Sequence, residues 1–112
     1  RYDNVELPDG GEGIRRCQCG GFIRPDVVWF GELLPESEYD EAERHCRQCD
    51  LFMSVGTSGA VYPAAGLPMI AGSSGAFLIE INPEETELSS IMDLVIRGEA
   101  GSILSDIVGA IQ

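Results

Sequence analysis

The sequence has little positive charge. It holds seven Lys and Arg residues against 19 Asp and Glu, which gives a formal net charge of −12 over 112 residues. Nucleic acids and anionic membrane surfaces bind clustered basic side chains, so we expect neither as a partner. No apolar run reaches the ~20 residues of a membrane-spanning helix. No basic-then-apolar leader is present either, so the sequence predicts a cytoplasmic protein.

Histidine is also scarce, because His45 is the only one. It falls within a predicted helix that follows Pro35, with Ser37 as the N-terminal cap. This position predicts a surface or half-buried helix histidine, so no residue is assigned a catalytic role. Acidic residues in the first turn suit the positive end of the helix dipole: Glu38, Asp40 and Glu41. An apolar stripe recurs at helical spacing: Tyr39, Ala42, Cys46 and Cys49.

The most informative stretch comes next. Leu51–Val55 is a short apolar run that predicts a buried strand, and residues 61–71 predict a helix. Between them lies Gly56-Thr57-Ser58. A strand, a turn of small residues and a helix start can bring backbone N–H groups to a phosphate. Taken by themselves, these residues favour a plain strand-to-helix connection without a ligand over a phosphate site.

The remainder continues the alternation of strands and helices. Residues 71–75 predict a flexible turn, 76–81 a second strand, 94–96 a third, and 103–111 an amphipathic helix. This order predicts an α/β fold with a parallel sheet. Asn82 and the turn after residue 55 both follow strands, where open α/β sheets bind ligands. Three strands make a thin sheet with an uncovered face, which suggests that further chain belongs to the fold.

The first 31 residues show weaker patterns. Residues 1–21 predict loop with at most a short strand at residues 2–7. Val27–Phe30 predicts an extended segment, and Gly31 predicts a sharp change of direction after it.

Four cysteines without an export signal suggest metal ligands or core thiols rather than disulfides. Cys17 and Cys19 lie in a Gly-rich turn that suits a zinc knuckle, with two further ligands from outside this chain. Cys46 and Cys49 lie on the apolar stripe of a helix, which favours core thiols. A zinc site made by all four cysteines remains an alternative.

Taken together, these stretches resemble the C-terminal half of a sirtuin, an NAD-dependent protein deacylase, with residues 24–32 closest to the bacterial and mitochondrial type. The matches run in family order: Cys19-Gly-Gly, Arg24-Pro-Asp-Val-Val-Trp-Phe-Gly-Glu32, Cys49-Asp-Leu-Phe, Gly56-Thr-Ser, Val61-Tyr-Pro-Ala-Ala65, Glu80-Ile-Asn82 and Gly98-Glu-Ala100. The resemblance implies half of a Rossmann-like NAD domain over residues 23–112. It also implies the remnant of a zinc-binding module over residues 1–22.

The resemblance further implies the roles of individual residues. NAD contacts are expected from two turns and one helix start: Gly56, Thr57, Ser58, Asn82, Pro83, Glu84 and Ala100. The strand-like segment that pairs with an acylated lysine in protein substrates is expected at Val28, Trp29, Phe30, Gly31 and Glu32. Cys17 and Cys19 match the family's second zinc pair, one residue closer together than is usual.

The family's N-terminal half, with its catalytic histidine and its first zinc pair, has no match in this sequence. In a complete sirtuin the acyl oxygen attacks the ribose carbon of NAD as nicotinamide leaves. We therefore expect part of a protein lysine deacylase of deacetylase or desuccinylase type, inactive alone, with the missing half as its partner. The alternatives are a non-catalytic nucleotide- or peptide-binding module and a small four-Cys zinc-ribbon protein.

Overall fold

The computed structural model describes residues 16–111. These residues fall into two compact units, divided between Glu32 and Leu33. The predicted strand at residues 2–7 lies outside the described residues. In the first unit an isolated antiparallel bridge joins Arg16 and Phe22, and the remainder is turn and loop.

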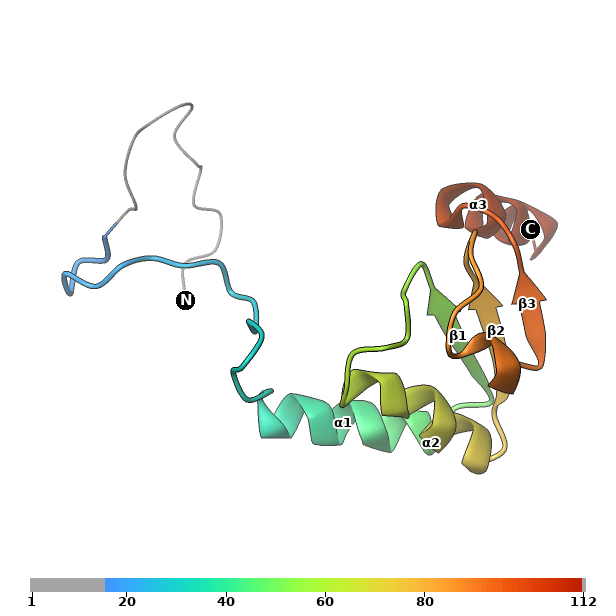
Figure 1. Ribbon diagram of the computed structural model, residues 1–112, viewed down its shortest axis with the longest axis horizontal. Coiled ribbons are helices and arrows are strands. Elements are labelled where there is room, and N and C mark those ends of the chain that lie inside the picture. Colours follow the sequence, from blue (N-terminus) through green and yellow to red (C-terminus); the bar gives the residue numbers. More distant parts are fainter. Residues whose placement is uncertain (1–15, 112) are drawn as a thin grey trace. The chain divides into compact units, whose positions relative to one another are not determined.

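The second unit is an α/β structure around a parallel sheet (Figure 1). Its strands are β1 (Leu51–Val55), β2 (Phe77–Ile81) and β3 (Leu94–Ile96), in the order β1-β2-β3. Leu51 pairs with Phe77, and Ile79 pairs with Leu94. Its helices are α1 (Glu36–Cys46), α2 (Leu67–Ser73) and α3 (Ala100–Ile111), with short 3-10 turns at Ala64–Gly66 and Ser89–Ile91. The prediction of a parallel α/β fold is confirmed.

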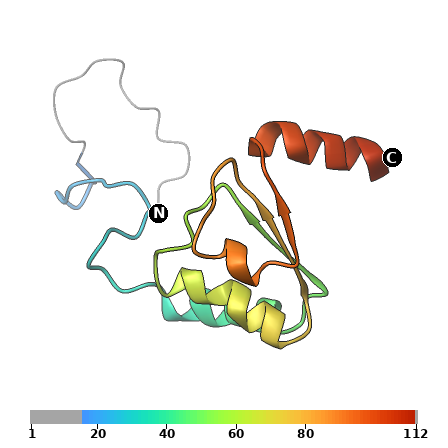
Figure 2. The same cartoon turned by 45° about the vertical axis from the view of Figure 1, so that its right-hand side comes forward.

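The core lies between the helices and one face of the sheet. Helices α1 and α2 lie side by side, and α2 contacts β1 and β2 (Figures 1 and 2). Cys46 of α1, Ala71 of α2, and Ala76 and Leu78 at β2 form the buried cluster. The predicted apolar stripe of α1 is confirmed for Tyr39, Ala42 and Cys46, which are half-buried or buried. The prediction is wrong for Cys49, because α1 ends at Cys46.

The opposite face of the sheet is open, as the sequence predicts for a three-stranded sheet. Its side chains form an apolar row that includes Leu51, Met53, Phe77 and Leu94, each between 36% and 49% exposed. Helix α3 lies beyond the arrowheads of the strands in both ribbon views (Figures 1 and 2). Its apolar stripe is partly uncovered, because Ile103 and Ile107 are only half-buried and Leu104, Val108 and Ile111 are exposed.

Two predicted helix starts are wrong. Helix α1 begins at Glu36 with Pro35 at the cap position, so Ser37 lies inside the first turn and makes no capping hydrogen bond. The helix predicted for residues 61–71 begins only at Leu67, after a turn and a 3-10 turn. Pro63 and Pro68 explain the shift, because a residue without an N–H is tolerated only in the first turn of a helix.

The turn predicted for residues 71–75 is shorter than expected. Helix α2 continues to Ser73 and ends in a Schellman motif with Gly75 at a φ of 97°. There Ala76 N–H donates to the Ala71 carbonyl at 3.1 Å, and Gly75 N–H donates to the Gly72 carbonyl at 3.0 Å. The motif turns the chain directly into β2.

Among the residues that the structure describes, no helix is both long enough and apolar enough to cross a membrane.

Candidate functional site

The candidate site lies where β1 and β2 end. Because the two strands are parallel neighbours, the turn after β1 and the loop after β2 emerge at the same edge of the sheet. Gly56 N–H donates to the carbonyl of Ile81 at 2.9 Å, which extends the pairing by one residue. Gly56 has a φ of 63°, the left-handed region that favours glycine, and this lets the chain leave the sheet sharply.

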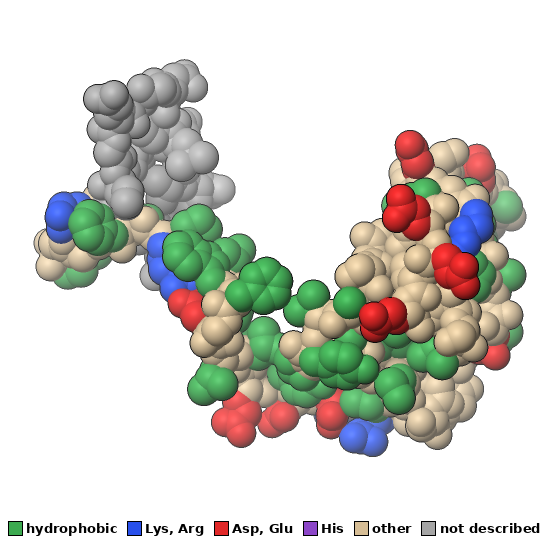
Figure 3. Space-filling view, in the orientation of Figure 1, with side chains coloured by type: hydrophobic (Ala, Val, Ile, Leu, Met, Phe, Trp, Pro, Cys, Tyr) green, Lys and Arg blue, Asp and Glu red, His purple; other side chains and the backbone are tan. Residues whose placement is uncertain are grey.

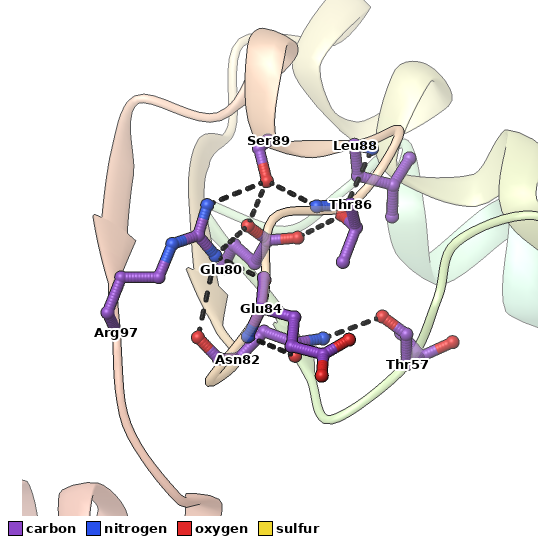
Figure 4. Close-up of polar contacts among 8 residues, drawn as sticks. All are labelled: Thr57, Glu80, Asn82, Glu84, Thr86, Leu88, Ser89 and Arg97. Carbon is purple, nitrogen blue, oxygen red and sulfur yellow. Dashed lines mark hydrogen bonds and ion pairs between the residues drawn. The ribbon is translucent and has the colours of Figure 1, made fainter.

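Asn82 connects these two segments. Its side chain is buried, with 8% exposed. The amide nitrogen donates to the Thr57 carbonyl at 2.9 Å, and the amide oxygen accepts the Glu84 N–H at 3.1 Å. One side chain thus fixes the turn after β1 against the loop after β2 (Figure 4).

The two segments border an open hollow of about 730 Å³, which we call the strand-end hollow. Small-molecule sites commonly occupy roughly 300–1,000 Å³. Its lining is formed by the turn after β1 and the loop after β2: Gly56, Thr57, Ser58, Ala60, Asn82, Pro83, Glu84, Glu85, Thr86 and Glu87. Six of the seven residues expected to contact NAD are therefore brought together here. The seventh, Ala100, is outside this lining and begins α3.

The hydroxyl groups of Thr57 and Ser58 stabilise the turn after β1 by accepting backbone hydrogen bonds. Thr57 Oγ1 accepts the Gly59 N–H at 3.3 Å, and Ser58 Oγ accepts the Ala60 N–H at 3.4 Å. Accepting a bond does not use a hydroxyl's own hydrogen, so each can still donate to a ligand. Neither residue caps a helix, because α2 starts only at Leu67.

The charge of the hollow is negative. Glu84, Glu85 and Glu87 are all exposed at its border, and its lining includes no Lys or Arg. Figure 3 shows acidic side chains over the unit that contains the sheet. A phosphate would have to be held by backbone N–H groups, while the carboxylates could accept hydrogen bonds from sugar hydroxyls.

A smaller apolar cavity of about 240 Å³ adjoins this region. It lies between β1 and the start of α2, and Thr57 lines both it and the strand-end hollow. Leu88 packs into this region against Gly59, where a Cβ would lie only 2.3 Å from Leu88 Cγ. The loop after β2 therefore contacts the turn after β1 through apolar packing as well as through Asn82.

Sequence reasoning missed a polar network behind the hollow. Glu80 of β2 is completely buried and accepts hydrogen bonds from Thr86, Ser89 and Arg97 (Figure 4). Burial alone would raise the pKa of Glu80, but these hydrogen bonds outweigh burial and lower it. A charged residue within the apolar run of β2 was the available signal.

The residues expected to pair with an acyl peptide lie in the first unit, on the loop of residues 24–32 that we call the Arg24 loop. The prediction of an extended segment at 27–30 is wrong, because Trp29 begins a turn in which Glu32 N–H donates to its carbonyl at 3.0 Å. Gly31 has a φ of 90°, which confirms the predicted change of direction. Val28, Trp29 and Phe30 are exposed.

Arg24 explains why this segment is closed rather than extended. Its guanidinium donates to both carboxylate oxygens of Glu32, at 2.6 and 2.8 Å, and to the Val27 carbonyl at 2.6 Å. It also stacks over the Trp29 ring at 4.7 Å. The hydrogen bonds from Arg24 and from the Trp29 N–H lower the pKa of Glu32 to about 2.

The first cysteine pair lies in a tight turn that suits metal ligation. Gly20 N–H donates to the Cys17 carbonyl at 2.9 Å, and Cys19 N–H points to the Cys17 sulfur at 3.4 Å. An N–H aimed at sulfur suits a metal-bound thiolate. Two thiolates supply half of a tetrahedral site, and across residues 16–111 no three candidate ligands gather in one group.

The second cysteine pair packs in the core, as predicted, although only Cys46 belongs to α1. Cys46 is 7% exposed, and Cys49 donates to the Cys46 carbonyl at 3.4 Å. Burial, with the neighbouring charges of Cys49 and Glu43, raises the pKa of the Cys46 thiol. The packing of both cysteines against the apolar core favours core thiols over a four-Cys zinc site.

His45 lies on the surface of α1, which confirms the prediction of a surface helix histidine. Its side chain is 66% exposed, and its ring lies 3.7 Å from the carboxylate of Glu41.

Comparison with known proteins supports the sirtuin resemblance. A sequence model described as the Sir2 family matches residues 3–63, more than half of the chain. An NAD-dependent protein deacylase of Pyrococcus abyssi is 45% identical over 90% of this chain. One of Mycobacterium tuberculosis is 50% identical over 79% of it. The chain spans 41% and 37% of these two relatives, about two fifths of their length.

Comparison with solved structures also finds Sir2 proteins. A Sir2 homologue in complex with NAD superimposes with a TM-score of 0.87 at 41% identity, covering 96% of this chain and 43% of that one. Sir2Af2 bound to a myristoylated histone peptide gives a TM-score of 0.79 at 47% identity, covering 86% of this chain and 42% of the other. With a family match over more than half of its length and the same α/β fold, this chain belongs to the Sir2 family, the sirtuins.

Proposed function

We propose that this chain is part of an NAD-dependent protein lysine deacylase of deacetylase or desuccinylase type. Residues 23–112 would supply half of the NAD-binding domain, and residues 1–22 would belong to a zinc-binding module. The observation that carries the proposal is the strand-end hollow, where Gly56–Ser58 and Asn82–Glu84 meet at the carboxyl ends of two parallel strands. The names of the matched relatives give the reaction class.

The chemistry of the hollow suits the ADP-ribose part of NAD. Thr57 and Ser58 present hydroxyl groups beside the backbone of a glycine turn, which suits phosphate and ribose oxygens. The three border carboxylates suit the hydroxyl hydrogens of a ribose. When bound, NAD supplies the electrophilic ribose carbon, and the residues of this chain hold and orient its nucleotide part.

The Arg24 loop would bind the second substrate. Its exposed Val28, Trp29 and Phe30 suit the apolar stem of an acylated lysine. Pairing with an extended peptide would require the loop to open, because the backbone groups of Val27 and Trp29 bond to Arg24 and Glu32 in the closed form. A relative of known structure holds a myristoylated histone peptide, which supports acyl-lysine proteins as the substrate class.

Cys17 and Cys19 would hold zinc together with two ligands from outside this chain. We assign no general base among these residues, because His45, the only histidine, lies exposed on α1 and does not line the strand-end hollow. We therefore expect residues 1–112 alone to bind nucleotide without turnover.

Calorimetric titration with ADP-ribose tests the nucleotide part of the proposal. Asn82→Ala removes two hydrogen bonds that hold the hollow together, each worth about 0.5–1.5 kcal/mol. We expect ADP-ribose to bind roughly 10-fold more weakly to this variant. Gln48→Ala, an amide truncated at the exposed end of α1, is the control and should bind as the unchanged protein does.

The reaction itself is tested on the native gene product with an acetyl-lysine or succinyl-lysine peptide. NAD-dependent release of the acyl group supports the deacylase. Binding of ADP-ribose without turnover would favour the non-catalytic module, and failure to bind ADP-ribose at all would contradict the nucleotide site.

A further inference from the structure

Glu80 is a buried charge that the proposed reaction does not use. It lies in the middle of β2, between two apolar neighbours, with no exposed surface. Its carboxylate accepts hydrogen bonds from the Thr86 hydroxyl, from Ser89 Oγ at 2.5 Å, and from an Arg97 nitrogen at 2.9 Å. Figure 4 shows these side chains converging from three separate segments. We call Glu80, Thr86, Ser89 and Arg97 the Glu80 clasp.

The charge of Glu80 fixes the direction of each hydroxyl in the clasp. Thr86 and Ser89 each give their single hydrogen to the carboxylate. Their oxygens are then acceptors, Thr86 Oγ1 for the Leu88 N–H at 3.1 Å and Ser89 Oγ for the Thr86 N–H at 2.9 Å. A carboxylate is acceptor-only, whereas an amide would place a donor against one of these donors.

Arg97 extends the clasp to the start of the same loop. Besides Glu80, its guanidinium donates to the Glu84 carbonyl at 2.7 Å and to Ser89 Oγ at 3.0 Å. It also reaches the Asn82 carbonyl at 3.4 Å. One cation, held by one buried anion, therefore ties both ends of residues 82–89 to the sheet.

Residues 82–89 are the loop that forms the acidic side of the strand-end hollow. From this loop Asn82 reaches Thr57, and Leu88 packs against Gly59. The clasp thus lies behind the hollow and holds the loop that supplies six of the hollow's lining residues: Asn82, Pro83, Glu84, Glu85, Thr86 and Glu87.

We propose that Glu80 is a positioning residue for the nucleotide site, which sets the conformation of residues 82–89 through the hydrogen-bond directions of Thr86, Ser89 and Arg97. That the ligand is a nucleotide rests on the proposed function, whereas the effect of Glu80 on the conformation of residues 82–89 does not. A buried ion pair adds little net stability compared with apolar packing, so its effect should be sought in the geometry of the loop.

The test uses Glu80→Gln, which keeps the shape of the side chain and removes its charge. Glu43→Gln is the matched control, because it breaks the Glu43–Arg47 ion pair on α1, away from the hollow. The first measurement is amide hydrogen exchange of the ligand-free protein. We expect the Leu88 and Glu84 amides to exchange at least 10-fold faster in Glu80→Gln and at the unchanged rate in Glu43→Gln.

The second measurement is binding of ADP-ribose, at a temperature where both variants are folded. We expect Glu80→Gln to weaken binding about 10-fold and Glu43→Gln to leave it within twofold. In the native deacylase the KM for NAD should rise, while kcat and the KM for the acyl peptide stay within twofold. A loss of overall stability alone would not raise the KM for NAD while leaving kcat and the KM for the acyl peptide unchanged.

Should Glu80→Gln fail to fold, Ser89→Ala takes its place, since it removes one hydroxyl and keeps the buried ion pair. Ser89→Ala should speed the exchange of the two amides and weaken ADP-ribose binding, each by about threefold. Unchanged exchange and unchanged ADP-ribose binding in these variants would overturn the inference. Faster exchange in a protein that never binds ADP-ribose would instead uphold the clasp and refute the nucleotide site.

Discussion

Replacing Gly59 by alanine should destabilise the protein through backbone strain and through a clash with Leu88. Gly59 is buried with a φ of 66°, and an added Cβ would lie 2.3 and 2.5 Å from two carbons of Leu88. The left-handed backbone costs a non-glycine residue roughly 1–2 kcal/mol. Overpacking a filled site costs about 1–3 kcal/mol more. We therefore expect Gly59→Ala to lower the free energy of unfolding by about 2–5 kcal/mol.

Gly56→Ala separates the two costs. Gly56 has nearly the same φ, 63°, but an added Cβ would meet nothing within 4 Å. It should lose only the roughly 1–2 kcal/mol of backbone strain. Urea unfolding followed by circular dichroism measures both variants.

A double variant then assigns the difference to Leu88. Leu88→Ala alone removes a buried side chain and should cost about 2–5 kcal/mol. Combined with Gly59→Ala it also removes the clash, so the double variant should lose about 1–3 kcal/mol less than the sum of the single losses. Equal losses in Gly59→Ala and Gly56→Ala, with additive behaviour of the double variant, would refute the contact between the two segments.

Other predictions concern the first unit and the cysteines. Because the pKa of Glu32 is lowered from 4.5 to about 2, its stabilisation of the Arg24 loop is complete above pH 4.5 and is lost as the pH falls towards 2. Trp29 fluorescence should follow that loss, and Glu32→Gln should abolish the pH dependence. Cys46→Ser should lower the free energy of unfolding by about 1–3 kcal/mol, because it buries a hydroxyl. The native product should lose zinc on replacement of Cys17 and Cys19 by Ser, and keep it on replacement of Cys46 and Cys49, as metal analysis would show.

Strands were the most predictable part of this chain. Leu51–Val55 and Leu94–Ile96 match their predicted bounds residue for residue, because apolar runs bounded by glycine and polar residues leave little choice. The prediction that Leu51–Val55 is buried is wrong, since Ser54 is its only buried residue and one face of the sheet is open. Helix starts were less predictable. Ser37 is a residue type that often caps helices, but Pro35 has the extended backbone conformation of a cap residue. The helix therefore begins two residues earlier than predicted.

Contacts between distant residues could not be predicted from local pattern. The pairing of Arg24 with Glu32 turned an apolar run into a closed loop, although the run itself reads as extended. The convergence of Glu80 and Arg97 depends on the pairing of β2 with β3, which places Ile81 beside Ile96. By contrast, the meeting of Gly56–Ser58 with Asn82 followed from the parallel order of the strands, and the structure brings them together.

The open face of the sheet has a consequence for the behaviour of the protein in solution. Leu51, Met53, Phe77 and Leu94 present an apolar surface next to β1, whose outer edge has unpaired backbone groups in the described structure. Such a surface favours self-association. At neutral pH the net charge of −12 opposes it by mutual repulsion. Near the isoelectric point of about 4.2 that repulsion vanishes, so acidification should turn a dispersed protein into an aggregating one well before Glu32 loses its charge.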